Sequence, residues 1–186
     1  MRISVEMVCW TLLLFLTSSS PLCAQAGSDQ DSQKSCRSFV QGFYDWYLKQ
    51  TLNEKAGPAS DLALKYKSSS FAPELLRRLK EDSAAQAKVS GEIVGLDFDP
   101  FLNAQDVGER YVVGKITPKQ GSYWAEVYGV WNGKKSQKPD VVPELIFKDR
   151  HWLFVNFHYG KSKYPENENL LSILRVLRED RRKQTN

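Results

Sequence analysis

The chain has 186 residues, of which 41% are hydrophobic and 12% aromatic, and it carries a formal net charge of +4 at pH 7. Its lysines and arginines are dispersed among acidic neighbours and form no continuous basic stripe, which argues against a nucleic-acid-binding protein. The length fits a single domain behind a removable leader, and the aromatic content is ample for its core.

The first residues are typical of a secretory signal peptide. Met1 and Arg2 precede an apolar run over residues 8–16 that only Thr11 interrupts, and the small residues Ala24 and Ala26 follow, which is the order of a charged region, an apolar region and a cleavage site. The apolar run is far shorter than the ~20 residues that a membrane-spanning helix needs. We therefore predict that residues 1–26 are cleaved and that the product is exported, to the periplasm or the exterior, without a membrane span.

Cleavage would leave Cys36 as the only thiol, because Cys9 and Cys23 are removed. No intramolecular disulfide is then possible, and burial at the start of a helix is a better explanation of Cys36 than catalysis. Residues 27–35 before it are small and polar and lack an apolar pattern. We expect a flexible lead there.

Three helices are predicted next. Aromatic and aliphatic residues recur at helical spacing over residues 37–50, which predicts an amphipathic helix. After the Gly57-Pro58 break, Asp61 is suited to cap a short second helix. Pro73 suits the first turn of a third helix that ends near Ala87.

The second half of the chain predicts an antiparallel sheet. From Gly91 the apolar period changes from helical to two, and β-branched and aromatic residues gather in short runs. The predicted strands cover residues 111–117, 123–131, 141–148 and 152–159. Turn residues between them, at 119–121, 132–133 and 149–150, are few, and such short connections favour antiparallel neighbours.

A C-terminal helix completes the expected domain. Leucine and isoleucine recur at helical spacing between Leu170 and Leu177, and a basic stretch follows. We expect one domain over residues 36–178 and a polar tail over 179–186. The fold class is α+β, with N-terminal helices packed against a curved antiparallel sheet that wraps around the first helix like a cone and leaves a cavity.

Three segments carry a resemblance to a known family: residues 43–48 (Phe-Tyr-Asp-Trp-Tyr-Leu), 97–106 (Asp-Phe-Asp-Pro-Phe-Leu-Asn-Ala-Gln-Asp) and 123–127 (Tyr-Trp-Ala-Glu-Val). Together they resemble the domain-of-unknown-function 3828 family of bacterial envelope proteins, over residues 36–159. The resemblance implies a nuclear-transport-factor-2-like (cystatin-like) fold and an exported protein, and it brings no activity, ligand or catalytic residue. The chain departs from the lipoprotein members of that family because Leu22 precedes Cys23 where a small residue is expected.

Polar side chains concentrate where the first extended run of the second half ends. Asp97 and Asp99 are two residues apart, so they would share one face of an extended chain, and Pro100 then favours a turn. With Asn103 and Asp106 they offer oxygen ligands to a calcium-like ion, although their spacing does not match an EF-hand. We favour the alternative that Asp99 caps the turn through local amide groups and that Asn103 and Asp106 do the same further on.

An acid/base enzyme is a second possibility. If Asp97 faced into the cavity beside Tyr44 and His158, burial would raise the pKa of Asp97 and the tyrosine hydroxyl would hold an anionic intermediate. Against this, both faces of the strand that carries His158 are largely apolar, which is typical of a packed histidine. No metal or cofactor is predicted, because neither histidine lies near a cysteine or another histidine.

The aromatic strand offers a binding surface. Tyr123, Trp124, Tyr128 and Trp131 are more open than the other aromatic residues, and Glu126 lies among them. The candidate ligand-binding residues are therefore Tyr44, Asp97, Asp99, Asn103, Asp106, Trp124, Glu126, Tyr128 and His158.

The favoured function is a secreted, non-catalytic binding or protein-interaction module of the cell envelope. Its partner would be an envelope protein, or a small apolar or peptide ligand. The alternatives are the cofactor-free enzyme and an immunity or inhibitor protein, for which residues 133–138 are the candidate protruding loop.

Overall fold

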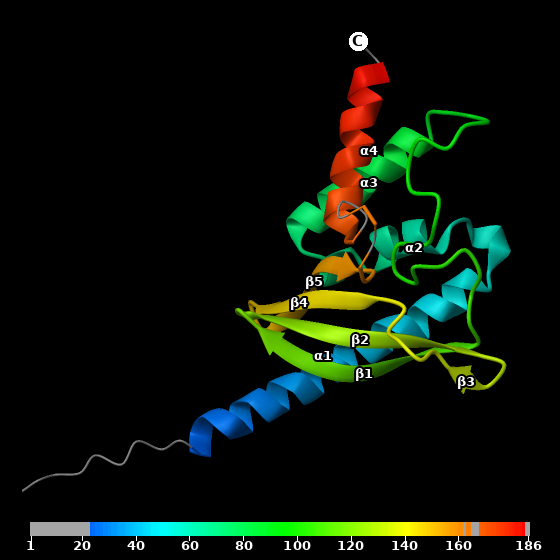
Figure 1. Ribbon diagram of the computed structural model, residues 1–186. Coiled ribbons are helices and arrows are strands. Elements are labelled where there is room, and N and C mark those ends of the chain that lie inside the picture. The colour runs from blue at the N-terminus through cyan, green and yellow to red at the C-terminus, as the bar shows by residue number, and fades with distance from the viewer. Residues whose placement is uncertain (1–22, 162, 165–167, 185–186) are drawn as a thin grey trace, which may run out of the picture.

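The computed structural model describes residues 23–161, 163–164 and 168–184 (Figure 1). Most of the expected signal peptide, residues 1–22, lies outside the described residues, and residues 23–26 belong to the first helix. The α+β class is confirmed, because helices from the first half of the chain pack with a curved antiparallel sheet and a further helix follows the last strand.

The first helix, α1 (Cys23–Thr51), is longer than the sequence predicted. Residues 27–35, expected as a flexible lead, are helical, and the Ser35 hydroxyl accepts a hydrogen bond from the Trp152 indole at 3.0 Å. The packed half of α1 supplies the costly helical nucleus, and each further turn then adds hydrogen bonds at little cost. An extension of this kind needs no apolar pattern.

Two shorter helices, α2 (Ala59–Tyr66) and α3 (Pro73–Gln86), each follow a 3-10 turn, η1 (Glu54–Ala56) and η2 (Ser68–Ser70). Pro73 occupies the start of α3 as predicted, where its missing N–H breaks no helical bond. Asp61 does not cap α2, because that helix begins earlier, at Ala59. Its carboxylate instead accepts a hydrogen bond of 2.7 Å from Ser83 of α3.

The sheet contains β1 (Arg110–Lys119), β2 (Ser122–Trp131), β3 (Lys134–Lys135), β4 (Val142–Lys148) and β5 (His151–His158). The strand order is β1-β2-β4-β5, with the short β3 paired to the end of β2. All three predicted turns are present, each with two consecutive residues at positive φ, such as 49° at Asn132 and 73° at Gly133. Such turns match the right-handed twist of antiparallel strands. The Asn132-Gly133 turn leads into β3, which the sequence did not predict.

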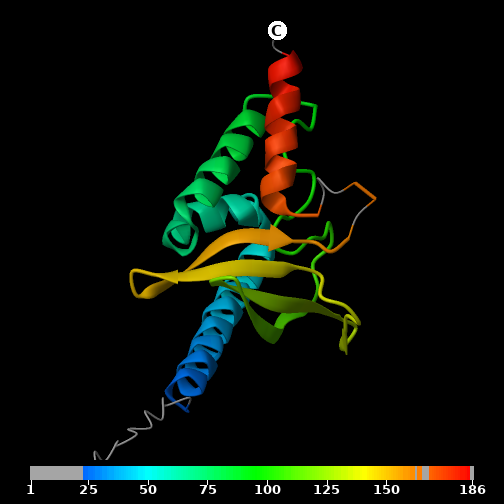
Figure 2. The ribbon, with the colours of Figure 1, turned by 60° about the vertical axis from the view of Figure 1, so that its left-hand side comes forward.

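The core lies between α1 and one face of the sheet, and in the part of the chain that the structure describes no helix covers the opposite face (Figure 2). Aromatic rings fill this core. Phe43 of α1 lies 4.9 Å from Phe154, and Phe101 lies 5.0 Å from Phe157, between ring centroids. The space that a cone would enclose is therefore occupied by side chains at this point.

The free edge of β1 is covered by side chains of α1. The Gln41 amide donates to the Tyr111 carbonyl at 2.9 Å and its oxygen accepts from the Val113 amide at 3.0 Å. Arg37 donates to the Val113 carbonyl at 2.7 Å. These groups replace a neighbouring strand, so this edge offers fewer free backbone groups to another chain.

The last helix, α4 (Leu170–Gln184), stands beside α3 at the end of the molecule away from the start of α1 (Figures 1 and 2). It continues through most of residues 179–186, the expected polar tail. The helix predicted from the leucine spacing is present, and it places Leu170 and Leu174 in the core, while Leu171 and Leu177 are half-buried.

Candidate functional site

Residues 93–98 form a ridge between two hollows. The α1 hollow, about 690 Å³, also has walls from the end of α1, the start of α2 and residues 104–107. The α4 hollow, about 520 Å³, lies between the ridge, Tyr159 and α4. Ile93, Leu96, Asp97 and Phe98 line both hollows.

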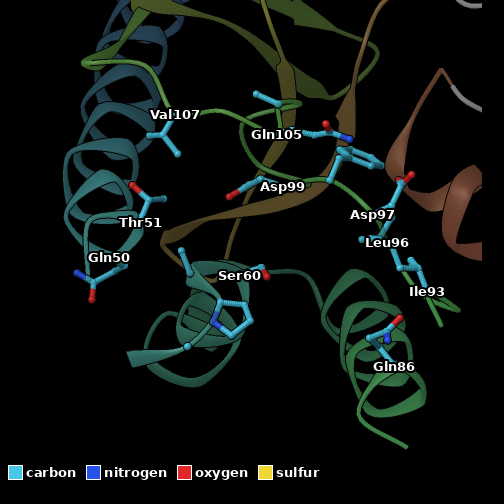
Figure 3. A pocket seen from close by; sticks show the side chains of 15 residues that line it. Gln50, Thr51, Ser60, Gln86, Ile93, Leu96, Asp97, Asp99, Gln105 and Val107 are labelled. Atoms are coloured by element: carbon cyan, nitrogen blue, oxygen red, sulfur yellow. The ribbon is translucent and has the colours of Figure 1, made fainter. Parts of the chain in front are cut away.

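Both hollows are lined by apolar, amide, hydroxyl and carboxylate groups. Beyond the ridge, the α1 hollow has Val107, Ser60 and Gln105 in its walls (Figure 3), and the α4 hollow has Ile173 and Leu177. No lysine, arginine or histidine belongs to either set of described lining residues. The arrangement suits a ligand with apolar groups and, if charged, a positive charge.

Side chains of α3 hold the ridge backbone, which has no strand partner. The Gln86 oxygen accepts from the Val94 and Gly95 amides at 2.9 and 3.0 Å, and its amide donates to the Glu92 carbonyl at 2.9 Å. Asp82 accepts from the Leu96 amide at 2.9 Å. Because the side chains satisfy these backbone groups, the ridge keeps a defined shape outside regular secondary structure.

Arg181 of α4 completes this support, which corrects the expectation of a polar tail. Its guanidinium lies 2.6 Å from the Asp82 carboxylate and donates to the Val94 carbonyl at 2.7 Å. Asp82 is only 4% exposed, and a charge at that depth needs such a partner. The ridge is thus tied to two helices that are far apart in sequence.

Asp99 adopts the turn role that the sequence favoured. One carboxylate oxygen accepts from the Phe101 and Leu102 amides at 2.9 and 3.1 Å, and the other accepts from the Tyr47 hydroxyl at 2.7 Å. Burial raises the pKa of the Asp99 carboxyl, and the three hydrogen bonds partly oppose that rise. Burial, together with the Asp99 charge, also raises the pKa of Tyr47 well above its ordinary value. The carboxylate is therefore committed to the fold.

Asp97 has a different environment. The two aspartates do not share a face, because the segment is not a strand; Figure 3 shows Asp99 turned towards α1 and Asp97 turned the other way. Asp97 is exposed and has no hydrogen-bond or ion-pair partner among the described residues. It is thus available at the rim shared by both hollows.

Asn103 and Asp106 do not join a metal site. Asn103 donates from its side chain to the Asp140 carbonyl at 2.9 Å and sits at a positive φ of 53°. Asp106 is exposed. Within the described ranges no group of three or more histidine, cysteine, aspartate or glutamate side chains is placed to hold a metal ion.

Tyr44, Asp97 and His158 are not brought together. Tyr44 is buried, and its hydroxyl donates to the Phe101 carbonyl at 2.9 Å. His158 lies on the open face of the sheet, where its ring stacks on Trp124 with centroids 3.9 Å apart and its Nε2 is 3.0 Å from Glu144. The acid/base arrangement considered from the sequence is therefore absent from the described residues.

The aromatic strand β2 presents Trp124, Glu126 and Tyr128 on its open face, but their groups are largely occupied. The Lys119 ammonium nitrogen lies 3.8 Å from the Trp124 ring centroid, and the Trp124 ring also stacks with His158. The Tyr128 hydroxyl donates to Glu126 at 2.8 Å, which raises the pKa of Tyr128. Tyr123 packs inward, with its ring centroid 5.0 Å from that of Trp152. The aromatic and charged side chains on the open sheet face therefore contact one another and leave few groups free for a ligand.

The supporting residues Gln86, Asp82 and Arg181 were not found from the sequence. One signal was available: Asp82 and Gln86 continue the helical spacing of the buried Leu75 and Leu79, so they face inward. No pattern in the sequence relates α3 to Arg181.

Comparisons with protein-family models, with curated proteins and with solved structures found no match. Across the described residues, no helix has the length and apolar character to cross a bilayer.

Proposed function

We propose that this protein is a non-catalytic binding module that recognises its partner at the ridge. The observation that carries the proposal is a supported segment between two hollows, with exposed apolar side chains and a carboxylate, that of Asp97, which has no partner among the described residues. Ile93 is 71% exposed and Val107 is 40% exposed, although both line the α1 hollow. Apolar side chains exposed around a hollow are typical of a binding site.

The hydrogen bonds that hold the ridge favour binding because they reduce its cost in conformational entropy. Gln86, Asp82 and Arg181 fix the backbone before a ligand arrives, so little conformational entropy is lost on association. A site of this kind binds more tightly than a mobile loop with the same side chains.

The enzyme alternative is less well supported by the geometry. Acid/base chemistry needs Asp97 in a water-restricted cavity within hydrogen-bond reach of a second polar group. Asp97 is exposed instead, and the buried Asp99 already binds Tyr47 and two backbone amides. A binding role agrees with both environments, because Asp97 is exposed to a ligand and Asp99 holds the turn.

Export to the bacterial cell envelope is part of the proposal. It rests on the signal-like pattern of residues 1–26 and on the resemblance to an exported family. The test is N-terminal sequencing of the protein recovered from the periplasm and the medium of a bacterial host. A product that begins shortly after Ala24 or Ala26 supports export, and an intact N-terminus found only in the cytoplasm contradicts it.

A fragment screen tests the binding site itself. Amide resonances of the labelled protein are recorded against a set of neutral, cationic and anionic fragments. Fragments that bind should shift the amides of Leu96, Phe98 and Gln105 together. Binding fragments that shift only Trp124, Tyr128 and His158 would place the site on the open sheet face and contradict the proposal.

A further inference from the structure

The chemistry around Asp97 restricts what the ridge can recognise. Among the described residues, Asp97 is the one charged residue in the lining of the α4 hollow, where its neighbours include Leu96, Phe98, Ile173 and Leu177. On the other side, the α1 hollow adds Val107. Asp99 also lines the α1 hollow, but its carboxylate is already bound by Tyr47 and two backbone amides. Asp97 is therefore the available carboxylate between two hollows that each combine apolar and polar groups.

The ligand's charge follows from electrostatics. No described basic residue lines either hollow, and Asp97 has no ion-pair partner among the described residues. An anionic ligand would meet Asp97 without compensation, whereas an ammonium or guanidinium group would form a charge-assisted hydrogen bond with it.

The ligand's shape follows from the two hollows. A ligand that fills both of them while its cation meets Asp97 carries apolar groups on either side of that cation. A simple alkyl amine has one apolar arm, whereas a peptide supplies side chains in succession. The free side chains of Gln105 and Ser60, which have no partner among the described residues, suit the amide groups of such a peptide.

We propose that the ridge binds a peptide segment of a partner protein in which a lysine or arginine is flanked by apolar residues. This inference rests on the proposed binding function and names its ligand. Asp97 binds the cation, and the α1 and α4 hollows take the flanking apolar side chains.

Three capped peptides test the proposal: acetyl-Leu-Lys-Leu-amide, its norleucine analogue, which lacks the charge, and its glutamate analogue. Each is titrated into the labelled protein while the ridge amides are recorded. The lysine peptide should bind roughly fivefold more tightly than the norleucine peptide, as expected for an exposed ion pair, and the glutamate peptide most weakly. This preference should fall with added salt.

Two variants locate the effect. Asp97→Asn should abolish the preference for lysine over norleucine, and it leaves the fold intact because Asp97 has no partner among the described residues. Asp106→Asn is the matched control, since Asp106 is exposed in the next loop and lines neither hollow. The control should keep the full preference.

The results separate a wrong ligand class from a wrong binding site. If fragments shift the ridge amides but the three peptides bind equally or not at all, the ligand class is wrong and the binding function stands. If hexylammonium alone binds as tightly as the lysine peptide, the site recognises small amines and the peptide proposal is overturned. If neither fragments nor peptides shift the ridge, both proposals fail.

Discussion

Arg181 of α4 and Asp82 of α3 form a 2.6 Å ion pair, and each of them also binds the backbone of the ridge. The pair therefore joins the C-terminal helix, the third helix and the candidate site in one cluster. Loss of Arg181 leaves the Asp82 charge poorly compensated in a buried position, and loss of Asp82 removes both an ion-pair partner of Arg181 and the acceptor of the Leu96 amide. Stability and the shape of the site are coupled through these two residues.

The first prediction concerns this ion pair. Asp82→Ala and Arg181→Ala should each lower the free energy of unfolding by roughly 3 kcal/mol. The double variant should lower it by clearly less than the sum of the two single effects. Urea unfolding of the four proteins measures this coupling. Arg178→Ala is the control, because Arg178 lies 3.9 Å from Glu81 at a partly exposed position and should change stability by less than about 1 kcal/mol. Additive effects of the two single changes would show that the pair is not coupled.

The second prediction concerns Gly95 on the ridge. A Cβ atom there would lie 2.9 Å from an Asp82 carboxylate oxygen and 3.3 Å from the Gln86 Cβ. Gly95→Ala should therefore destabilise the protein by about 1 to 3 kcal/mol, since Asp82 is held by its ion pair and cannot move freely.

Gly42→Ala is the matched control for this change. Gly42 lies in α1 with nothing within 4 Å of its Cβ position, so alanine should stabilise the helix by about 0.5 to 1 kcal/mol. Thermal unfolding compares the two variants. Equal effects at Gly95 and Gly42 would contradict the close packing of the ridge on α3.

The third prediction is a pH dependence from Asp99. Burial raises its folded-state pKa above the ordinary value of 3.8, so the folded protein binds this proton more tightly than the unfolded chain. Its contribution to stability is then present below the unfolded pKa and is lost as pH rises through the folded pKa. Asp99→Asn keeps an oxygen for the Phe101 and Leu102 amides and removes this titration.

Relative to wild type, Asp99→Asn should therefore gain stability as pH rises from about 3 to 7. Urea unfolding at a series of pH values gives the difference directly. A difference between the two proteins that stays constant over that range would mean that the Asp99 pKa is not raised in the folded state.

The fourth prediction concerns the β1 edge. Gln41→Ala removes two hydrogen bonds to the backbone of β1 and should lower stability by about 1 to 2 kcal/mol. It also frees edge groups for pairing with another chain, so self-association should increase. Ser38→Ala, an exposed change on the same helix, is the control. Light scattering and urea unfolding report the two effects, and a variant that matches Ser38→Ala in both would contradict the role of Gln41.

The parts of the fold that the sequence predicted correctly depend on residues close together in the chain. The turns at Asn132-Gly133 and Asp149-Arg150 were predicted because a two-residue turn favours particular residue types at adjacent positions. Asp99 was assigned to its turn for the same reason, since its amide partners are two and three residues away. The polar start of α1 was missed, because a helix that extends from a packed segment needs no apolar pattern of its own.

The candidate site was predicted only in part because its contacts join distant residues. Asp97 was singled out, but the groups that define its surroundings come from α1, α2, α3 and α4. Asp82 and Arg181 are 99 residues apart, and no local pattern relates them. Trp124 and His158 were both named, yet their stacking depends on the pairing of β2 with β4 and of β4 with β5.

Amide hydrogen exchange measures whether the ridge is held in place before any ligand arrives. The amides of Val94, Gly95 and Leu96 should be protected, while Ile93, whose amide has no partner among the described residues, should exchange quickly. Gln86→Ala should remove the protection of Val94 and Gly95. If all four amides exchange at the same fast rate in the unmodified protein, the ridge is a mobile loop and is not held by Gln86 and Asp82.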